Sequence, residues 1–291
     1  MTDLDRYIAG VPCWTDHSSA DPEGAAEFYG GLFGWELEET MPEGAPGKYL
    51  QARLGGGLVA AVGSQMDDAA PATWNTYIWV ESADDTAAKV REAGGSVLSD
   101  PMDIFDSGRM AFFADPEGAA FGVWQANQHR GAAVVNEPGS VNFNGLNTRD
   151  PEGAKAFYGA VFGWEALPMG MWALRPYGDH LEALNPGTRA RTKEVGGPER
   201  FEEVVAALNV IPDDQPDTPA YWDVTFGVAD ADATAAKAKE LGGTVLVDPF
   251  DAPWIRGTVI RDPQGATFKA NQFVPENKDM AGQGADSATA S

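Results

Sequence analysis

The chain has 291 residues, 43% of them hydrophobic and 22% charged, a composition typical of a globular protein of about two domains. Its net charge of −24 argues against nucleic-acid binding, because neutralising phosphate groups requires clustered lysine and arginine side chains. We expect no membrane span and no signal peptide, because no apolar run reaches ~18 residues and the N-terminus lacks basic and apolar segments.

The first predicted strand, 11–17, contains the only cysteine, Cys13. A single cysteine excludes an internal disulfide and is consistent with a reducing, cytoplasmic location. No histidine lies where it would activate this thiol, so we expect Cys13 to be buried and inert.

The next predicted element is a helix that begins after Asp21, a favourable N-cap. Pro22 suits the first helical position, and Gly34 favours the left-handed conformation that ends a helix. The apolar residues between them share one face, which predicts a core role for Ala25, Phe28, Tyr29, Leu32 and Phe33. Residues 21–36 return at 150–165 without a gap and with twelve of sixteen positions identical, so the chain is an internal duplication.

Later segments repeat as well. The helical segment Thr86–Gly95 recurs as Thr234–Gly243, and the type I turn Asp115-Pro116-Glu117-Gly118 recurs as Asp262-Pro263-Gln264-Gly265. Strands are predicted near 48–54, 57–63, 74–81, 108–114, 120–126, 256–261 and 266–272. Each half is therefore predicted to run strand, helix, three strands, and then the same order again.

These repeats predict two domains, at 8–130 and 140–275, joined by a linker at 131–139. The second domain carries an insertion at about 186–219, with a helix predicted from Pro198 to Leu208. Residues 276–291 are small and polar, and we expect them to form a disordered tail.

The Asp-Pro-x-x-Ala-x-x-Phe-Tyr motifs at Asp21 and Asp150, with the Asp-Pro-x-Gly turns at Asp115 and Asp262, resemble the vicinal oxygen chelate superfamily. This superfamily includes glyoxalases, bleomycin-resistance proteins and dioxygenases. The resemblance implies an α+β fold of four βαβββ modules in two domains, whose curved mixed sheets form cup-shaped sites. The chain looks most like two-domain actinobacterial members described as glyoxalase-like or hydroxylase-like, some of which lie in antibiotic gene clusters as binding or resistance proteins.

The resemblance also implies where a divalent metal would bind, on the first, fourth, fifth and eighth strands of each domain. Counting from the motifs places these positions at Trp14, Val59 or Ala60, Asn75 and Gly122 in the first half, and at Phe143, His180 or Glu182, Asp223 and Lys269 in the second. No combination supplies the three or four nitrogen and oxygen ligands of a catalytic metal, so we expect neither a metal nor another cofactor.

Aromatic residues stand where relatives have metal ligands. Trp14 and Phe143 occupy equivalent first-strand positions, and Asn75, Tyr77 and Trp79 alternate along the fifth strand and so share one face. Aromatic walls favour a planar ligand, or a cationic one through cation–π contact, oriented by a few polar groups. The candidate ligand-binding residues are Trp14, Asn75, Tyr77, Phe105, Trp124, Phe143, Asn144, Trp172, Trp254 and Lys269. A core role is the alternative for each tryptophan.

Asp16 and Asp223 are the candidate catalytic bases, although the counterpart of Asp16 in the second half is Gly145. The leading hypothesis is a cytoplasmic, metal-independent protein that binds an aromatic small molecule, such as a secondary metabolite or antibiotic, as a monomer or homodimer. The alternative is a glyoxalase-like lyase or isomerase, or a hydroxylase or oxygenation helper, that uses a carboxylate base. A metal-dependent glyoxalase and a protein-interaction module are further alternatives.

Overall fold

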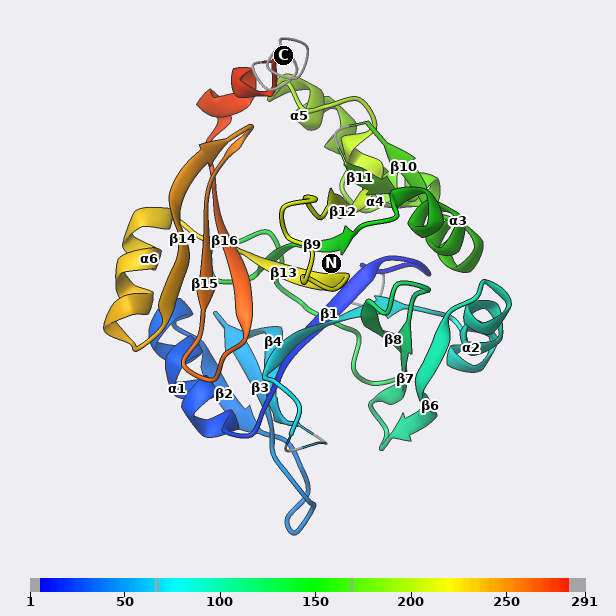
Figure 1. Cartoon of the computed structure of the whole chain (residues 1–291), viewed down its shortest axis with the longest axis vertical. Coiled ribbons are helices and arrows are strands. Elements are labelled where there is room, and N and C mark those ends of the chain that lie inside the picture. Colours follow the sequence, from blue (N-terminus) through cyan, green and yellow to red (C-terminus); the bar gives the residue numbers. More distant parts are fainter. Residues whose placement is uncertain (1–5, 66, 68, 169, 283–291) are drawn as a thin grey trace. The chain divides into compact units, whose positions relative to one another are not determined.

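The computed structural model describes residues 6–65, 67, 69–168 and 170–282, which form two sheets of eight strands each (Figure 1). The first sheet has the order β2-β3-β4-β1-β5-β8-β7-β6, with β1 parallel to β4 and β5 parallel to β8. The elements of the first half are β1 (Pro12–Ser19), α1 (Pro22–Phe33), β2 (Glu36–Glu39), β3 (Tyr49–Leu54), β4 (Gly57–Ser64), β5 (Thr73–Trp79), α2 (Ala83–Glu92), β6 (Ser96–Ile104), β7 (Gly108–Ala114) and β8 (Ala120–Ala126).

The second sheet repeats this topology in the order β10-β11-β12-β9-β13-β16-β15-β14. Its elements are β9 (Val141–Thr148), α3 (Pro151–Phe162), β10 (Glu165–Leu167), β11 (Met171–Ala173), α4 (Arg175–Leu184), α5 (Thr188–Glu194), η2 (Phe201–Glu203), β12 (Val204–Val210), β13 (Tyr221–Gly227), α6 (Ala231–Glu240), β14 (Thr244–Ala252), β15 (Ile255–Arg261), β16 (Thr267–Phe273) and η3 (Pro275–Gly282). The predicted α+β fold of four βαβββ modules is confirmed. Within the described ranges, no helix is long and apolar enough to cross a bilayer.

The repeated helices have the capping expected from their sequence. The Asp21 carboxylate accepts a hydrogen bond from the Gly24 N–H, Pro22 opens the helix, and Gly34 ends it at φ 73°. Asp150 and Gly163 cap α3 in the same way. The segment is therefore scaffold, as its apolar face predicted.

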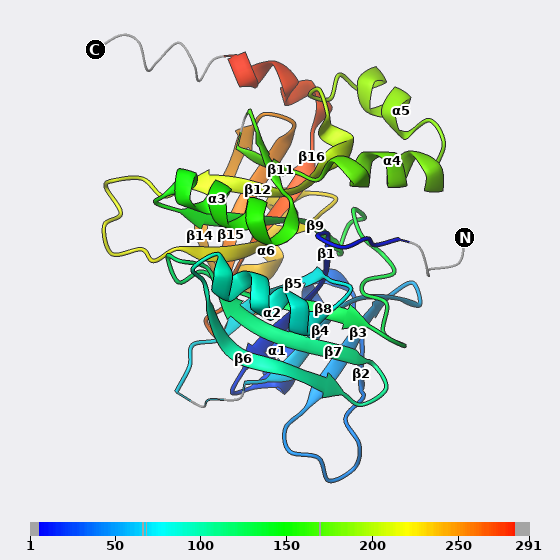
Figure 2. The ribbon, with the colours of Figure 1, turned by 90° about the vertical axis from the view of Figure 1, so that its right-hand side faces the viewer.

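The chain forms two compact units, each of which combines modules from both halves of the sequence. Unit 1 contains the chain up to Thr15 with Asn75–Ala133 and Phe143–Val224. Unit 2 contains Asp16–Trp74, Val134–Asn142 and the chain from Thr225. In unit 1, α2 contacts β6, β7 and β8 and packs against α3 (Figure 2). In unit 2, α6 covers β14, β15 and β16 and packs against α1 (Figure 1).

A buried Trp–Tyr–Asp motif ties the modules together within each unit. In unit 1, the Tyr158 hydroxyl donates to Asp115 Oδ2 at 3.1 Å and accepts from Trp222 Nε1 at 2.9 Å. Asp115 Oδ1 accepts the Ala119 N–H in the Asp-Pro-x-Gly turn, so this turn is joined to α3. Burial raises the pKa of Tyr158 well above its ordinary value, which keeps its hydroxyl a donor.

Unit 2 repeats the motif with Trp74, Tyr29 and Asp262. Both hydrogen bonds of the Tyr29 hydroxyl measure 2.8 Å. His17 Nε2 also lies 2.8 Å from Asp262 Oδ2, at a position that Leu146 takes in the second half. Tyr29 and Tyr158 are core residues as predicted, and their hydroxyls explain why the helix motif and the distant turn motif repeat together.

One predicted element is wrong. The segment predicted as a helix from Pro198 to Leu208 forms η2 and then the strand β12, which pairs in parallel with β9. The valines at its start favour a strand, and pairing inside the sheet overrides the helical pattern. The helices of this region are α4 and α5, so His180 and Glu182 lie on a helix and the fourth-strand position lies on β12.

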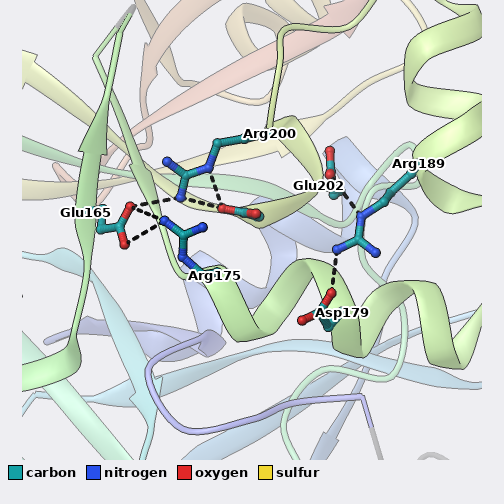
Figure 3. Close-up of polar contacts among 7 residues, drawn as sticks. Glu165, Arg175, Asp179, Arg189, Arg200 and Glu202 are labelled. Atoms are coloured by element: carbon teal, nitrogen blue, oxygen red, sulfur yellow. Dashed lines mark hydrogen bonds and ion pairs between the residues drawn. The ribbon is translucent and has the colours of Figure 1, made fainter.

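Ion pairs hold α4 and α5 against η2 and β10 (Figure 3). Glu165 contacts Arg175 at 3.4 Å and Arg200 at 2.9 Å, and Arg189 bridges Asp179 and Glu202. Such exposed pairs contribute roughly 0–1 kcal/mol each. Because each arginine is already paired, this cluster is structural. In unit 2, η3 (Pro275–Gly282) contains the first residues of the segment predicted as a disordered tail, and residues 283–291 lie outside the described residues.

Candidate functional site

One face of the first sheet in unit 1 is aromatic. In β5, β8 and β7, Tyr77 and Phe112 both pair with Gly122, and Trp79 and Met110 both pair with Trp124. The opposite face packs on α2 through Ile78, Val123 and Phe113. Side chains alternate along a strand, so the paired rows lie on the face away from the helices. We call Trp14, Tyr77, Trp79, Met110, Phe112 and Trp124 the aromatic face.

Trp14 belongs to this face because it is three residues from His17 on β1. His17 packs against Tyr29 and Trp74 in the helix layer of unit 2, at ring distances of 5.6 and 5.3 Å. Trp14 therefore points the other way, and its ring meets His129 edge to face at 4.3 Å.

Glycines make room for these rings. A Cβ on Gly122 would lie 2.5 Å from the Tyr77 ring, and one on Gly108 would lie 2.6 Å from the Trp124 ring. The Tyr77 ring therefore occupies the space beside Gly122. Trp14, Tyr77 and Trp124 are only 5–6% exposed, and their ring contacts are with His129 and Phe112.

His129 lies between two rings of the aromatic face. Its ring centroid is 4.3 Å from that of Trp14 and 5.4 Å from that of Trp124. Both of its ring nitrogens are buried, and neither has a hydrogen-bond partner among the residues that the structure describes. Burial lowers the pKa of His129 to about 4, so the imidazole is neutral at pH 7.

The rim of the face carries more exposed groups. Trp79 stacks on Tyr7 at 6.0 Å, and the Arg130 guanidinium lies 5.3 Å from its ring centroid. At the tip of the β6–β7 hairpin, Phe105 is 67% exposed and holds a left-handed φ of 46°. An aromatic residue in that conformation is strained, which is typical of functional positions.

The part of the second sheet that belongs to unit 1 carries a group of polar side chains, Asn147, Asn209 and Asp223. Asn147 Nδ2 donates to Asp223 Oδ2 at 2.6 Å, and a Cβ on Gly145 would lie 2.9 Å from Asp223 Oδ1 and 3.0 Å from Asn209 Nδ2. Gly145 therefore lets this carboxylate approach the backbone of β9. Asn144 faces the opposite side of β9 from Phe143, where it accepts a hydrogen bond from the Thr76 hydroxyl at 2.9 Å.

In unit 2, Asp16 accepts a hydrogen bond from the Tyr49 hydroxyl at 3.1 Å. Lys269 lies on β16 beside Thr225 and Val259, on the face opposite buried Phe268. Trp254, at the tip of the β14–β15 hairpin, stacks on Phe273 at 6.5 Å and has a left-handed φ of 69°.

The structure thus places Trp14, Tyr77 and Trp124 on one face of the sheet, whereas Phe105 lies at the exposed tip of the β6–β7 hairpin. The carbonyl of Asn75 accepts from the Thr15 hydroxyl at 2.6 Å, next to this face. Trp172 is fully buried in the unit 1 core against Tyr158 and Trp164, where its ring serves packing.

Comparison with known proteins identifies the fold. Residues 16–123 match the glyoxalase/bleomycin resistance protein/dioxygenase superfamily, and residues 141–271 match a glyoxalase-like domain of that group. The chain is 40% identical over 280 residues to the glyoxylase-like protein CFP32 of Mycobacterium tuberculosis, covering 95% of this chain and 100% of that one. It belongs to the glyoxalase/bleomycin resistance protein/dioxygenase superfamily.

Other members of the superfamily extend the comparison. The anthracycline biosynthesis protein DauV of Streptomyces sp. strain C5 is 36% identical over 279 residues, covering 91% of this chain and 94% of that one. The Mn(II)-bound glyoxalase of Novosphingobium aromaticivorans aligns with a TM-score of 0.57 at 15% identity, over 91% of this chain and 83% of that one. The dioxygenase LapB of Pseudomonas sp. KL28 has a TM-score of 0.56 at 13% identity, over 91% and 93%. These distant structures support the fold alone.

The superfamily implies a divalent metal, and the residues of this chain do not fit one. The first-strand position carries Trp14, whose ring packs against His129, and the eighth-strand position carries Gly122, which Tyr77 covers. On the second sheet, the corresponding positions carry Phe143 and Lys269. Across the described ranges, no three His, Cys, Asp or Glu side chains are placed to hold a metal ion.

Sequence reasoning missed several polar residues of these faces. His129 follows β8, and its burial depends on how Trp14 and Trp124 enclose it, which no local pattern encodes. Asn209 was missed because β12 was taken for a helix. Asn147 alternates with Gly145 on β9, and that spacing was the available signal.

Proposed function

We propose that this chain is a metal-independent member of its superfamily that binds a planar aromatic small molecule at the aromatic face of unit 1. The observation that carries the proposal is the replacement of the expected metal ligands by Trp14 and by Gly122 covered by Tyr77. Aromatic rings bind flat ligands by offset stacking and edge-to-face contact.

The relatives support the same ligand class. Two of them are named as anthracycline biosynthesis proteins, and an anthracycline is a fused-ring aromatic compound. The net charge of −24 favours a neutral or cationic ligand over an anionic one. We propose that the chain sequesters or presents such a compound in the cytoplasm, as a resistance protein or biosynthetic accessory, without binding nucleic acid or membrane, and as a monomer or homodimer.

Tryptophan fluorescence tests the proposal. A panel of fused-ring aromatic compounds should quench emission in a saturable manner, and Trp14→Phe and Trp124→Phe should each weaken binding about tenfold, the effect of losing ~1.4 kcal/mol of stacking. Phe273→Leu, which changes an exposed aromatic residue of unit 2, should bind as the wild type does. A panel that gives neither quenching nor a thermal shift, with both tryptophan variants unchanged, would exclude the aromatic face as a ligand site.

An enzymatic role is the second candidate, favoured by the two buried carboxylates. Asp16 is hydrogen-bonded to Tyr49 and Asp223 to Asn147, so each is held in a fixed orientation. A carboxylate placed in this way can move a proton between neighbouring carbons, as a lyase, isomerase or oxygenation helper requires. This role predicts turnover that Asp16→Asn or Asp223→Asn abolishes while the unfolding temperature is kept.

A further inference from the structure

The two ring nitrogens of His129 have no hydrogen-bond partner among the described residues, although the backbone of His129 is hydrogen-bonded on both sides. The His129 N–H donates to the Ser107 carbonyl at 3.0 Å, and the His129 carbonyl accepts from Trp124 Nε1 at 2.8 Å. The β6–β7 hairpin thereby holds this residue against the aromatic face. Buried polar groups in folded proteins are nearly always hydrogen-bonded, so an exception indicates a missing partner.

The chemistry of the missing partner follows from the state of the ring. A neutral imidazole carries one N–H donor and one nitrogen with a lone pair. The rings of His129 and Trp14 meet edge to face at an interplanar angle of 85°, and an aromatic π-cloud can accept a weak hydrogen bond only from an N–H. It offers the lone pair nothing, and the indole N–H of Trp124 is already committed to the His129 carbonyl. The missing partner is therefore a hydrogen-bond donor.

We propose that His129 is the specificity-determining residue of the aromatic face and accepts a hydrogen bond from a hydroxyl group on the ligand's aromatic ring. The inference rests on the proposed function and narrows it to phenolic, hydroxylated aromatic compounds. Burial keeps the ring neutral at pH 7, which preserves the lone pair that the hydroxyl needs. Such a site discriminates against a ligand that fills the same space without a donor, because the buried nitrogen then stays unpaired.

A pair of ligands tests this directly. 2-Naphthol and 2-methoxynaphthalene share their ring system, but only the naphthol can donate a hydrogen bond. Calorimetric titration should show that the wild-type chain binds 2-naphthol about tenfold more tightly. In His129→Phe this ratio should fall to about one, through weaker binding of 2-naphthol. His180→Phe, which removes a histidine of α4, should keep the wild-type ratio.

A spectroscopic measurement reports on the acceptor itself and needs no variant. The chain has only three histidines, so 15N-labelled imidazole resonances are readily assigned. Adding 2-naphthol should shift the unprotonated nitrogen of His129, whereas 2-methoxynaphthalene should not. A ratio kept in His129→Phe, or an unshifted His129 resonance at saturation, would overturn the inference while leaving aromatic binding in place. Failure of both naphthalenes to bind the wild type would overturn the inference and count against the proposed function.

Discussion

Lowering the pH from 7.5 to 5.0 should destabilise the wild-type chain more than its His129→Phe variant. Burial lowers the pKa of His129 from 6.5 to about 4 in the folded chain. Above pH 6.5 the imidazole is neutral in both states, so its contribution to stability is constant. Between pH 6.5 and 4 only the unfolded chain gains the proton, so the free energy of unfolding falls as the pH falls.

The two pKa values give the size of the effect. At pH 5.0 the unfolding free energy of the wild type should be about 2 kcal/mol lower than at pH 7.5 because of His129. Phenylalanine does not titrate, so His129→Phe should show no such loss at this position. Urea unfolding of both proteins at both pH values gives the loss of unfolding free energy on acidification for each protein. The loss in the wild type minus the loss in His129→Phe is the contribution of His129. Groups common to both proteins, such as Asp115, cancel in that comparison.

The same experiment tests the unpaired nitrogens. At pH 7.5 His129→Phe should be at least as stable as the wild type, because the variant removes two buried polar atoms that lack partners among the described residues. An equal loss in both proteins on acidification would refute the burial of the imidazole. If His129→Phe were less stable than the wild type at pH 7.5 by more than about 1 kcal/mol, the ring nitrogens of His129 would have to be hydrogen-bonded in the wild type.

Three substitutions test the packing, each by urea unfolding. Gly122→Ala should cost about 1–3 kcal/mol, because the new methyl group meets the Tyr77 ring; an unchanged midpoint would show that the ring lies elsewhere. Tyr158→Phe should cost about 2–3 kcal/mol, because it leaves Asp115 without the phenol donor, and a loss under about 0.5 kcal/mol would contradict the buried motif. Phe105→Gly should raise stability by about 1 kcal/mol by relieving the left-handed backbone and should weaken ligand binding; a destabilised variant would argue against strain.

The scaffold could be predicted from the sequence because its signals are local. Asp21, Pro22 and Gly34 specify where α1 begins and ends, and the second copy at 150–165 repeats the same cap and stop. The Asp-Pro-x-Gly turns gave strands β7, β8, β15 and β16 to within a residue of the observed bounds. The conformation of such residues depends on their sequence neighbours, so it can be predicted from the sequence alone.

The candidate site could be predicted only in part, because its geometry depends on contacts between distant segments. Counting along the strands made Trp14, Tyr77 and Trp124 candidate ligand-binding residues, but it could not predict that Trp14 and Trp124 enclose His129. Likewise, the apolar face of the repeated helix indicated the core role of Tyr158, but not its hydroxyl bond to Asp115, 43 residues earlier. In the insertion, a helix was predicted at 198–208, but part of this segment forms β12 and pairs with β9. Asn209, which lies on β12, was therefore not recognised as a site residue.

Ligand binding by metal-stripped protein tests the central claim most directly. After dialysis against a chelator and confirmation by elemental analysis that no divalent metal remains, the chain should be titrated with a fused-ring aromatic phenol. We expect saturable, stoichiometric binding that added Zn²⁺, Mn²⁺ or Ni²⁺ does not strengthen. Binding that disappears on stripping and returns with a stoichiometric metal would contradict the account.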